Sequence, residues 1–224
     1  MLKFTSSYND KKMLVFLKPQ TKCWRKWLYN FKKIIIMKTR NFLSTAFFAL
    51  TLFASTAIFA QKEKTVTVGG AAMYPSKNII ENAVNSKDHT TLVAAVKAAG
   101  LVETLQSKGP FTVFAPTNEA FNKLPKGTVE TLLKPENLKL LQTILTYHVV
   151  SGKMNSSDIA AAIKKGGGKA TLKTVSGGTL TAWMKGKSLY ITDENGKSAK
   201  VTIADVNQSN GVIHVIDNVV TPKA

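Results

Sequence analysis

A stretch near the C-terminus, residues 212–219, constrains the fold more than any other part of the sequence. It reads Val-Ile-His-Val-Ile-Asp-Asn-Val, so apolar side chains occupy both alternating faces of the extended chain. A strand with one face in water alternates apolar and polar residues, whereas a strand covered on both faces does not. We therefore expect a central strand of a sheet, packed on both faces. The Ser209-Asn210-Gly211 sequence before it is typical of a turn.

A second stretch, residues 109–121, predicts a strand that turns directly into a helix. Residues 111–115, Phe-Thr-Val-Phe-Ala, have the aromatic and β-branched content of a buried strand. Pro116 should end this strand because proline has no N–H to donate to a sheet. Thr117 can then cap a helix, and Glu119 in the first turn interacts favourably with the helix dipole.

Helical patterns come first in the rest of the chain, and strand patterns come later. We expect helices near residues 76–84, 88–99, 101–105, 128–133 and 157–163, and another that starts at residue 135. We expect strands at residues 170–175, 179–184, 189–192 and 199–206, separated by glycine turns. No internal repeat is present, and this order of elements predicts one α+β domain.

The segment that begins at Pro135 is the most strongly amphipathic part of the chain. At about 100° per residue, the leucines at 138, 140, 141 and 145 share one arc with Ile144. On the same wheel, His148 falls near the centre of the apolar arc and Tyr147 falls at its edge. We expect this helix to be buried on one side.

The beginning of the chain has the character of a leader. Residues 1–60 contain 11 of the 31 Lys and Arg but one of the 13 Asp and Glu, so they supply +10 of the formal charge of +18. Within them, Met-Lys-Thr-Arg-Asn precedes 19 uncharged residues that end at Ala60. This layout predicts a secretory signal peptide at 37–60, cleaved after Ala60. An uncleaved anchor is the alternative, because a membrane span needs about 20 apolar residues.

Three further segments complete the expected organisation. Residues 1–36 have no sustained periodicity, and we expect them to be an upstream extension outside the native product. Residues 61–75 are polar and then rich in Gly and Ala, which is typical of a linker. Residues 76–222 should form the domain.

The residue content limits the chemistry of this domain. Cys23 is the one cysteine and lies in the leader, so we expect no disulfide, thiolate nucleophile or cysteine metal site. The sequence has no Gly-x-Ser-x-Gly motif and no phosphate-binding loop, and no cofactor or metal is expected. We expect His89 to be exposed, and His148 and His214 to be buried, neutral and bonded to backbone carbonyls. A hydrolase built from His214, Asp217 and a serine is a lesser alternative.

Lysine is the dominant charged residue after position 60. Residues 61–224 contain 20 Lys, no Arg and 12 Asp and Glu. The lysines are spread along the chain and lack the bidentate Arg that nucleic-acid recognition favours, so nucleic acid is not an expected partner. A solvated surface is the leading interpretation, and binding of acidic glycans is the alternative.

Three ordered segments resemble the conserved motifs of a known family. Residues 109–121 and 209–222 resemble the first and second conserved boxes of the fasciclin-like adhesion domain, and Tyr147-His148 resembles its tyrosine-histidine pair. Leu124-Pro125 follows the first box as in that family. The resemblance covers roughly residues 76–222. It implies a wedge or sandwich of about seven β-strands with helices packed around it.

The resemblance also implies a class of function. In animal relatives the tyrosine-histidine pair and an Asp-Ile pair before the second box are associated with receptor binding. Tyr147, His148, Asp205 and Val206 are therefore the candidate ligand-binding residues, with valine replacing the isoleucine. A core or hydrogen-bonding role for Tyr147 and His148 is the alternative.

We therefore expect a non-catalytic adhesion or binding module that is secreted, periplasmic or at the cell surface. Its expected partner is an extracellular protein or polysaccharide, with membrane contact only through an uncleaved leader. A periplasmic or matrix structural protein that binds acidic glycans through lysines is the alternative.

Overall fold

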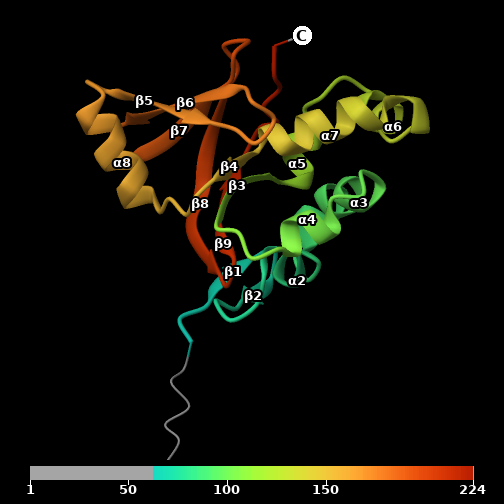
Figure 1. The fold of residues 1–224 in the computed structure, drawn as a ribbon, viewed down its shortest axis with the longest axis horizontal. Coiled ribbons are helices and arrows are strands. Elements are labelled where there is room, and N and C mark those ends of the chain that lie inside the picture. The colour runs from blue at the N-terminus through green and yellow to red at the C-terminus, as the bar shows by residue number, and fades with distance from the viewer. Residues whose placement is uncertain (1–62, 224) are drawn as a thin grey trace, which may run out of the picture. The chain divides into compact units, whose positions relative to one another are not determined.

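The computed structural model describes residues 63–223, and a seven-stranded mixed sheet lies at the centre of this part of the chain (Figure 1). The strand order is β4-β3-β9-β8-β7-β6-β5. Strand β3 (Phe111–Pro116) pairs in parallel with β9 (Gly211–Ile216), from Phe111 opposite Gly211 to Pro116 opposite Ile216. The two stretches with the strongest sequence signals are therefore neighbouring strands, and the expected central position of residues 212–219 is confirmed for β9.

The other strands complete this sheet. They are β4 (Val149–Ser151), β5 (Lys169–Lys173), β6 (Thr179–Lys185), β7 (Ser188–Thr192) and β8 (Ser198–Gln208), all paired antiparallel to their neighbours. Val150 in β4 also forms a bridge with Thr174, just beyond β5, so the sheet nearly closes on itself. A separate hairpin consists of β1 (Val66–Val68) and β2 (Ala71–Met73).

Helices pack on two sides of the sheet. The helices are α2 (Ile79–Ala83), α3 (Thr90–Ala98), α4 (Val102–Gln106), α5 (Asn118–Asn122), α6 (Thr128–Leu132), α7 (Leu138–Tyr147) and α8 (Ser156–Lys165), with 3₁₀ turns η1 (Lys87–His89) and η2 (Pro135–Asn137). Figure 1 shows α8 on the side of β5–β7, and α3, α4, α5 and α7 together on the other side of β3. The expected α+β architecture of about seven strands with surrounding helices is confirmed.

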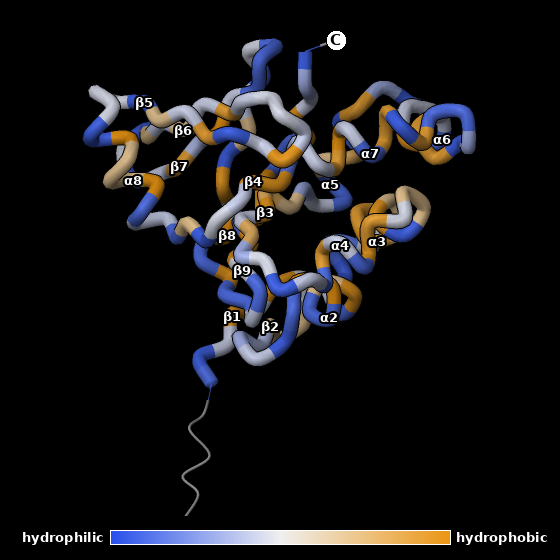
Figure 2. Tube along the Cα trace, viewed as in Figure 1, coloured by the Kyte–Doolittle hydropathy of each residue, from blue (hydrophilic) through white to orange (hydrophobic). Residues whose placement is uncertain are grey.

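Two hydrophobic cores lie on opposite faces of β3 and β9. The first core includes Met73, Ile79, Val96, Leu141 and Ile213, and lies among the β1–β2 hairpin and helices α2–α4 and α7. The second core is enclosed by the rolled sheet and α8, and its members include Phe114, Tyr147, Ile159, Leu180 and Ile191. Figure 2 shows apolar residues recurring along β3, α3 and α7. Strand β9 has no polar face because each of its two faces packs in one of these cores.

Capping explains where two helices begin. The Thr117 hydroxyl accepts a hydrogen bond from the Ala120 N–H, so Thr117 caps α5 as expected. Helix α2 is capped by Asn78, inside the range of 76–84 expected for this helix. The Asn78 side chain accepts from the Glu81 N–H, and the Glu81 carboxylate accepts from the Asn78 N–H, which forms a reciprocal capping box.

Three local expectations need correction. The described part of residues 61–75 is not a free linker, because Val68 and Met73 of the hairpin are buried in the first core. His89 is 3% exposed rather than solvent-facing. The apolar arc of α7 is only partly covered, since Leu141 is buried and Leu140 remains 50% exposed. For the segments of His89 and α7, the patterns predicted helical structure correctly but not the depth at which neighbouring elements cover it.

The expected leader, with its extension at 1–36 and signal peptide or anchor at 37–60, lies outside the described residues. Within residues 63–223, no helix combines the length and apolar character needed to cross a membrane.

Candidate functional site

Tyr147 lies at the C-terminal end of α7 and is completely buried. Its hydroxyl donates a hydrogen bond of 2.6 Å to the Thr179 carbonyl and accepts one of 3.2 Å from the Glu194 N–H. Burial raises the pKa of Tyr147 to about 12, so the phenol stays protonated and able to donate. The side chain therefore joins α7 to β6 and to the β7–β8 turn, and a partner cannot touch it in this structure.

His148 follows directly and is 4% exposed. Its Nδ1 lies 2.8 Å from the Ile144 carbonyl, and its Nε2 accepts from the Val220 N–H at 3.3 Å. The contact with Ile144 requires the proton to be on Nδ1, because a carbonyl only accepts. Burial lowers the pKa of His148 to about 4, although the Ile144 carbonyl opposes this. The expectation of a buried histidine bonded to a backbone carbonyl is confirmed here.

Asp205 and Val206 lie at a bulge in β8, where the register with β9 shifts between Ile203 and Val206. Val206 is buried in the first core. Asp205 has φ of 59°, a left-handed conformation that Asp tolerates better than most residues. Its carboxylate accepts hydrogen bonds from the Ser156 N–H, at 2.6 Å, and from the Ser156 hydroxyl. The bulge thus directs Asp205 to the first turn of α8, where negative charge is stabilising.

The four sequence-predicted residues therefore do not form one accessible surface. Tyr147, His148 and Val206 are buried, and Asp205 holds the start of α8. Their contacts are those of residues that fasten helices to the sheet.

His214 does not assemble a catalytic set with Asp217. Its Nε2 lies 2.9 Å from the Met154 carbonyl, and its Nδ1 accepts from the Asp205 N–H at 3.4 Å. Asp217 instead accepts from the Lys200 N–H and lies 4.0 Å from the Lys123 ammonium. Both His214 nitrogens are occupied by backbone groups, and burial lowers its pKa. His214 therefore has no free ring nitrogen that could accept a proton from a nucleophile.

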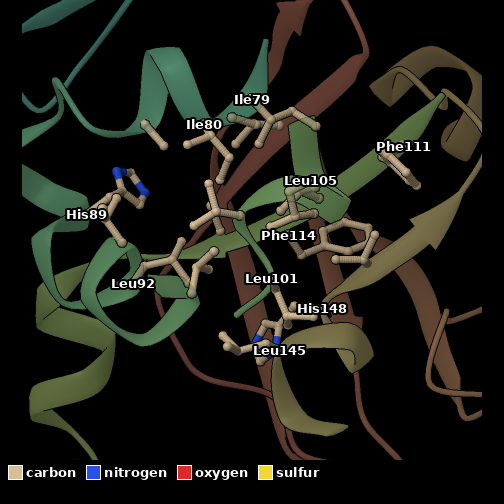
Figure 3. Close-up of a pocket in the computed structure, with 18 of the residues that line it drawn as sticks. Ile79, Ile80, His89, Leu92, Leu101, Leu105, Phe111, Phe114, Leu145 and His148 are labelled. Atoms are coloured by element: carbon tan, nitrogen blue, oxygen red, sulfur yellow. The ribbon is translucent and has the colours of Figure 1, made fainter. Parts of the chain in front are cut away.

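An apolar cavity of about 80 Å³ lies within the first core, whose members form most of its wall (Figure 3). Helices α2, α3 and α4 contribute Ile80, Leu92 and Leu105, and Figure 3 shows Phe111 and Phe114 on its other side. Its volume is about half that of a 150 Å³ apolar cavity known to bind benzene. Across the described residues, no group of three or more His, Cys, Asp or Glu is placed to hold a metal ion. The cavity has room for a small apolar group but lacks the converging polar groups of an active site.

His89 is one of two buried histidines on the wall of this cavity, the other being His148. Ser86 Oγ lies 2.9 Å from its Nδ1. Burial lowers the pKa of His89, while the Ala115 carbonyl and Asp88 act in the opposite direction. His89 is therefore neutral near pH 7 and fastens η1 to the residues before it.

The outer face of β5–β8 carries a feature that sequence reasoning missed. Trp183 on β6 and Tyr190 on β7 occupy paired positions, and their rings stack with centroids 4.8 Å apart and planes 19° apart. Both side chains are partly exposed. Alternation along β6 and β7 places each of them on the solvent side, but only the strand register brings them together.

The fold and these motifs agree with comparisons to known proteins. A model of the fasciclin domain matches residues 87–222, which is more than half of the chain. The chain belongs to the fasciclin family. A similar relative is Protein sll1483 of Synechocystis sp., which is 48% identical to this fasciclin protein over 183 residues, covering 79% of this chain and 94% of the relative.

Two further relatives concern surfaces and adhesion. Cell surface glycolipoprotein MPB83 of Mycobacterium bovis is 33% identical over 163 residues, covering 70% of this fasciclin protein and 65% of MPB83. A solved FAS1 domain pair from the insect cell adhesion molecule Fasciclin I superposes with a TM-score of 0.58 at 17% identity. That match covers 70% of this chain and 57% of the insect chain, and at this identity it supports the fold alone.

The buried histidines predict that acid destabilises this fasciclin protein. The pKa of His148 is 6.5 in the unfolded chain and about 4 in the folded one, so the unfolded state binds the proton more tightly. Stability should be fully present above pH 6.5 and should fall between pH 6.5 and pH 4. At 1.36 kcal/mol per pKa unit, His148 alone accounts for a loss of about 3 kcal/mol.

Urea unfolding at pH 7, 6, 5 and 4 measures this loss. The pKa values of His89 and His214 are also lowered, so they act in the same direction. A His148→Asn variant, which keeps an N–H donor but cannot titrate, should be less stable at pH 7 and should lose less stability on acidification. An equal pH dependence in the variant and the parent chain would contradict this assignment.

Proposed function

We propose that this fasciclin protein is an exported binding module that contacts extracellular protein or polysaccharide through its surface, without catalysis. One observation carries the proposal. The polar groups in the middle of the fold, at Tyr147, His148 and His214, are all hydrogen-bonded to the protein's own backbone. Side chains whose polar atoms are already bonded to the backbone are not free for substrate chemistry. Ligand contacts are therefore expected on the outer surface.

The expected leader and the surface location named for MPB83 support a secreted, periplasmic or cell-surface location. In this proposal the signal peptide at 37–60 exports the domain. Membrane contact then occurs only if that segment is retained as an anchor.

A second candidate is a periplasmic or matrix structural protein that holds acidic glycans through lysines. Residues 61–224 have 20 Lys and 12 Asp and Glu. Among residues 63–223 the only side-chain ion pair is Lys123 with Asp217. Most lysine ammonium groups in this range therefore have no carboxylate partner and are available to anions from outside.

Retention of extracellular material by the immobilised chain, beginning at Gln61, tests both candidates. Cell-envelope extracts and purified polysaccharides are applied at 20 mM and 500 mM NaCl, which differ severalfold in screening length. We expect saturable retention, with the ligand recovered chemically unchanged. Retention that persists at high salt indicates a packed apolar contact, and retention that is lost indicates lysine-mediated binding.

Two results would contradict the proposed function. The first is that no material is retained at 20 mM NaCl and none at 500 mM NaCl. The second is turnover of an ester, peptide or glycan by the purified chain that disappears in a His214→Ala variant.

A further inference from the structure

Four side chains from four neighbouring strands form one row on the outer face of the sheet. Lys169 in β5 is opposite Trp183 in β6, Trp183 is opposite Tyr190 in β7, and Tyr190 is opposite Lys200 in β8. Their strand neighbours Ala170, Ala182, Ile191 and Ala199 point into the second core. Because successive side chains alternate between faces, the row points to solvent. We define these four residues as the Lys-Trp-Tyr-Lys row.

The aromatic pair in this row is held in place. Trp183 Nε1 donates a hydrogen bond of 2.9 Å to Thr192 Oγ1, and Thr192 Oγ1 lies 2.8 Å from Ser198 Oγ. The Trp183 indole also stacks on the Tyr190 ring. A fixed, partly exposed aromatic surface loses little conformational entropy when a ligand stacks on it.

The charge around the pair is positive. Lys169 and Lys200 are exposed at the two ends of the row, about 14 Å apart at the usual spacing of strands. Lys173 and Lys185 are exposed on the same face. The other outward residues of β5–β8 near the row are Thr and Ser, and none is acidic.

The exposed carboxylate of the β7–β8 turn, that of Glu194, lies at the other end of the sheet. Glu194 accepts hydrogen bonds from the N–H and the hydroxyl of Thr179, which is four residues before Trp183. At about 3.4 Å per residue, this places it about 14 Å along the strand from the row. It therefore does not neutralise the lysines at the ends of the row. The Asp217 carboxylate lies beside Lys200 and accepts from its N–H at 2.8 Å, but the Lys123 ammonium 4.0 Å away offsets its charge.

We propose that the Lys-Trp-Tyr-Lys row binds an acidic polysaccharide. The apolar face of a sugar ring would pack on the aromatic pair, and its carboxylate or sulfate groups would pair with Lys169 and Lys200. The hydroxyl groups of the flanking Thr and Ser residues offer hydrogen bonds to sugar hydroxyls. This inference rests on the proposed function, to which it adds a ligand class and a location.

A protein partner fits this face less well. The core of a protein interface is an extended apolar area that is depleted in charged residues, and a polar rim surrounds it. Here two lysines flank only two rings. Single-stranded nucleic acid also uses stacking and positive charge, but it favours a groove with successive stacking platforms and arginine. Residues 61–224 contain no arginine.

Calorimetric titration with polygalacturonate and with neutral dextran tests the proposal. We expect binding of polygalacturonate, none of dextran, and a steep loss of affinity between 20 mM and 500 mM NaCl. The Lys169→Ala/Lys200→Ala double variant should lose about tenfold in affinity, since each exposed charge contact contributes a few-fold at most. The Tyr190→Ala variant should lose about fivefold, within the usual range for aromatic contacts.

Matched controls separate the row from general charge. The Lys134→Ala/Lys139→Ala double variant removes two exposed lysines near α7 and should retain the parent affinity. Thermal unfolding of every variant checks that the fold is kept. Equal weakening by both lysine pairs, or no effect of Tyr190→Ala, would overturn the proposal.

Two further results distinguish the alternatives. If polygalacturonate and other acidic polysaccharides do not bind while envelope protein is still retained, the row assignment is wrong and the proposed function stands. If oligo-dT binds more tightly than polygalacturonate and depends on Lys169 and Lys200, the face is a nucleic-acid surface and the proposal is wrong.

Discussion

Replacing Tyr147 by alanine should lower the free energy of unfolding by about 4 kcal/mol, as is typical when a large aromatic side chain is removed from a core. The ring is fully buried in the second core. It packs so closely on Gly178 that a Cβ at that position would lie 2.7 Å from the ring. Alanine would leave a cavity and would also remove the partner of the Thr179 carbonyl. Urea unfolding at pH 7 measures the change.

Two further variants separate the ring from the hydroxyl. Tyr147→Phe keeps the ring but leaves the Thr179 carbonyl and the Glu194 N–H without their partner, which should cost about 2 kcal/mol. Tyr190→Ala removes a partly exposed ring and should cost about 1 kcal/mol. If Tyr147→Ala instead kept full stability and abolished ligand binding, Tyr147 would be a contact residue and its assignment to the core would be wrong.

The main features of the fold could be predicted because they depend on burial, which periodicity reports. The apolar pattern of residues 212–219 required cover on both faces, and β9 has Ile213 and Val215 in one core and Ile216 in the other. Thr117 was identifiable as a helix cap because a threonine after a strand-ending proline has few other roles.

The site was harder to predict because it depends on contacts between distant segments. The helical wheel put Tyr147 at the edge of an apolar arc, and only the position of β6 and the β7–β8 turn decides that its hydroxyl is enclosed. His89 gave no signal of burial, since the residues that cover it come from other elements. The Lys-Trp-Tyr-Lys row requires three exact strand registers, each of which a shift of one residue would destroy.

Hydrogen bonds from loop side chains are a second kind of information that patterns do not carry. Asn210 appeared as an ordinary turn residue before the last strand, yet it is 6% exposed and connects three parts of the first core. Its Oδ1 accepts from the Ile79 N–H at 3.0 Å, where α2 begins. Its Nδ2 donates to the Leu105 carbonyl at 2.7 Å and to the Ser107 carbonyl at 2.9 Å, where α4 ends. The turn therefore fastens two helix ends to the sheet.

Replacing Asn210 by alanine should consequently lower the free energy of unfolding by about 4 kcal/mol. The change leaves one N–H and two carbonyls without their partner, and each buried unsatisfied group costs about 1–3 kcal/mol. Asn210→Asp keeps the acceptor for Ile79 but turns a carboxylate oxygen toward two carbonyls, so it should be no better tolerated at pH 7.

An exposed asparagine provides the comparison for this substitution. Asn85 also donates to a carbonyl, that of Glu81 at 2.7 Å, but on the surface, where water replaces the lost bond. Asn85→Ala should therefore cost about 0.5 kcal/mol, near the lower limit for a single hydrogen bond. Urea unfolding of both variants measures the difference. Equal losses at the two positions would mean that Asn210 contributes no more than a surface hydrogen bond, and the fastening of α2 and α4 would then depend on apolar packing alone.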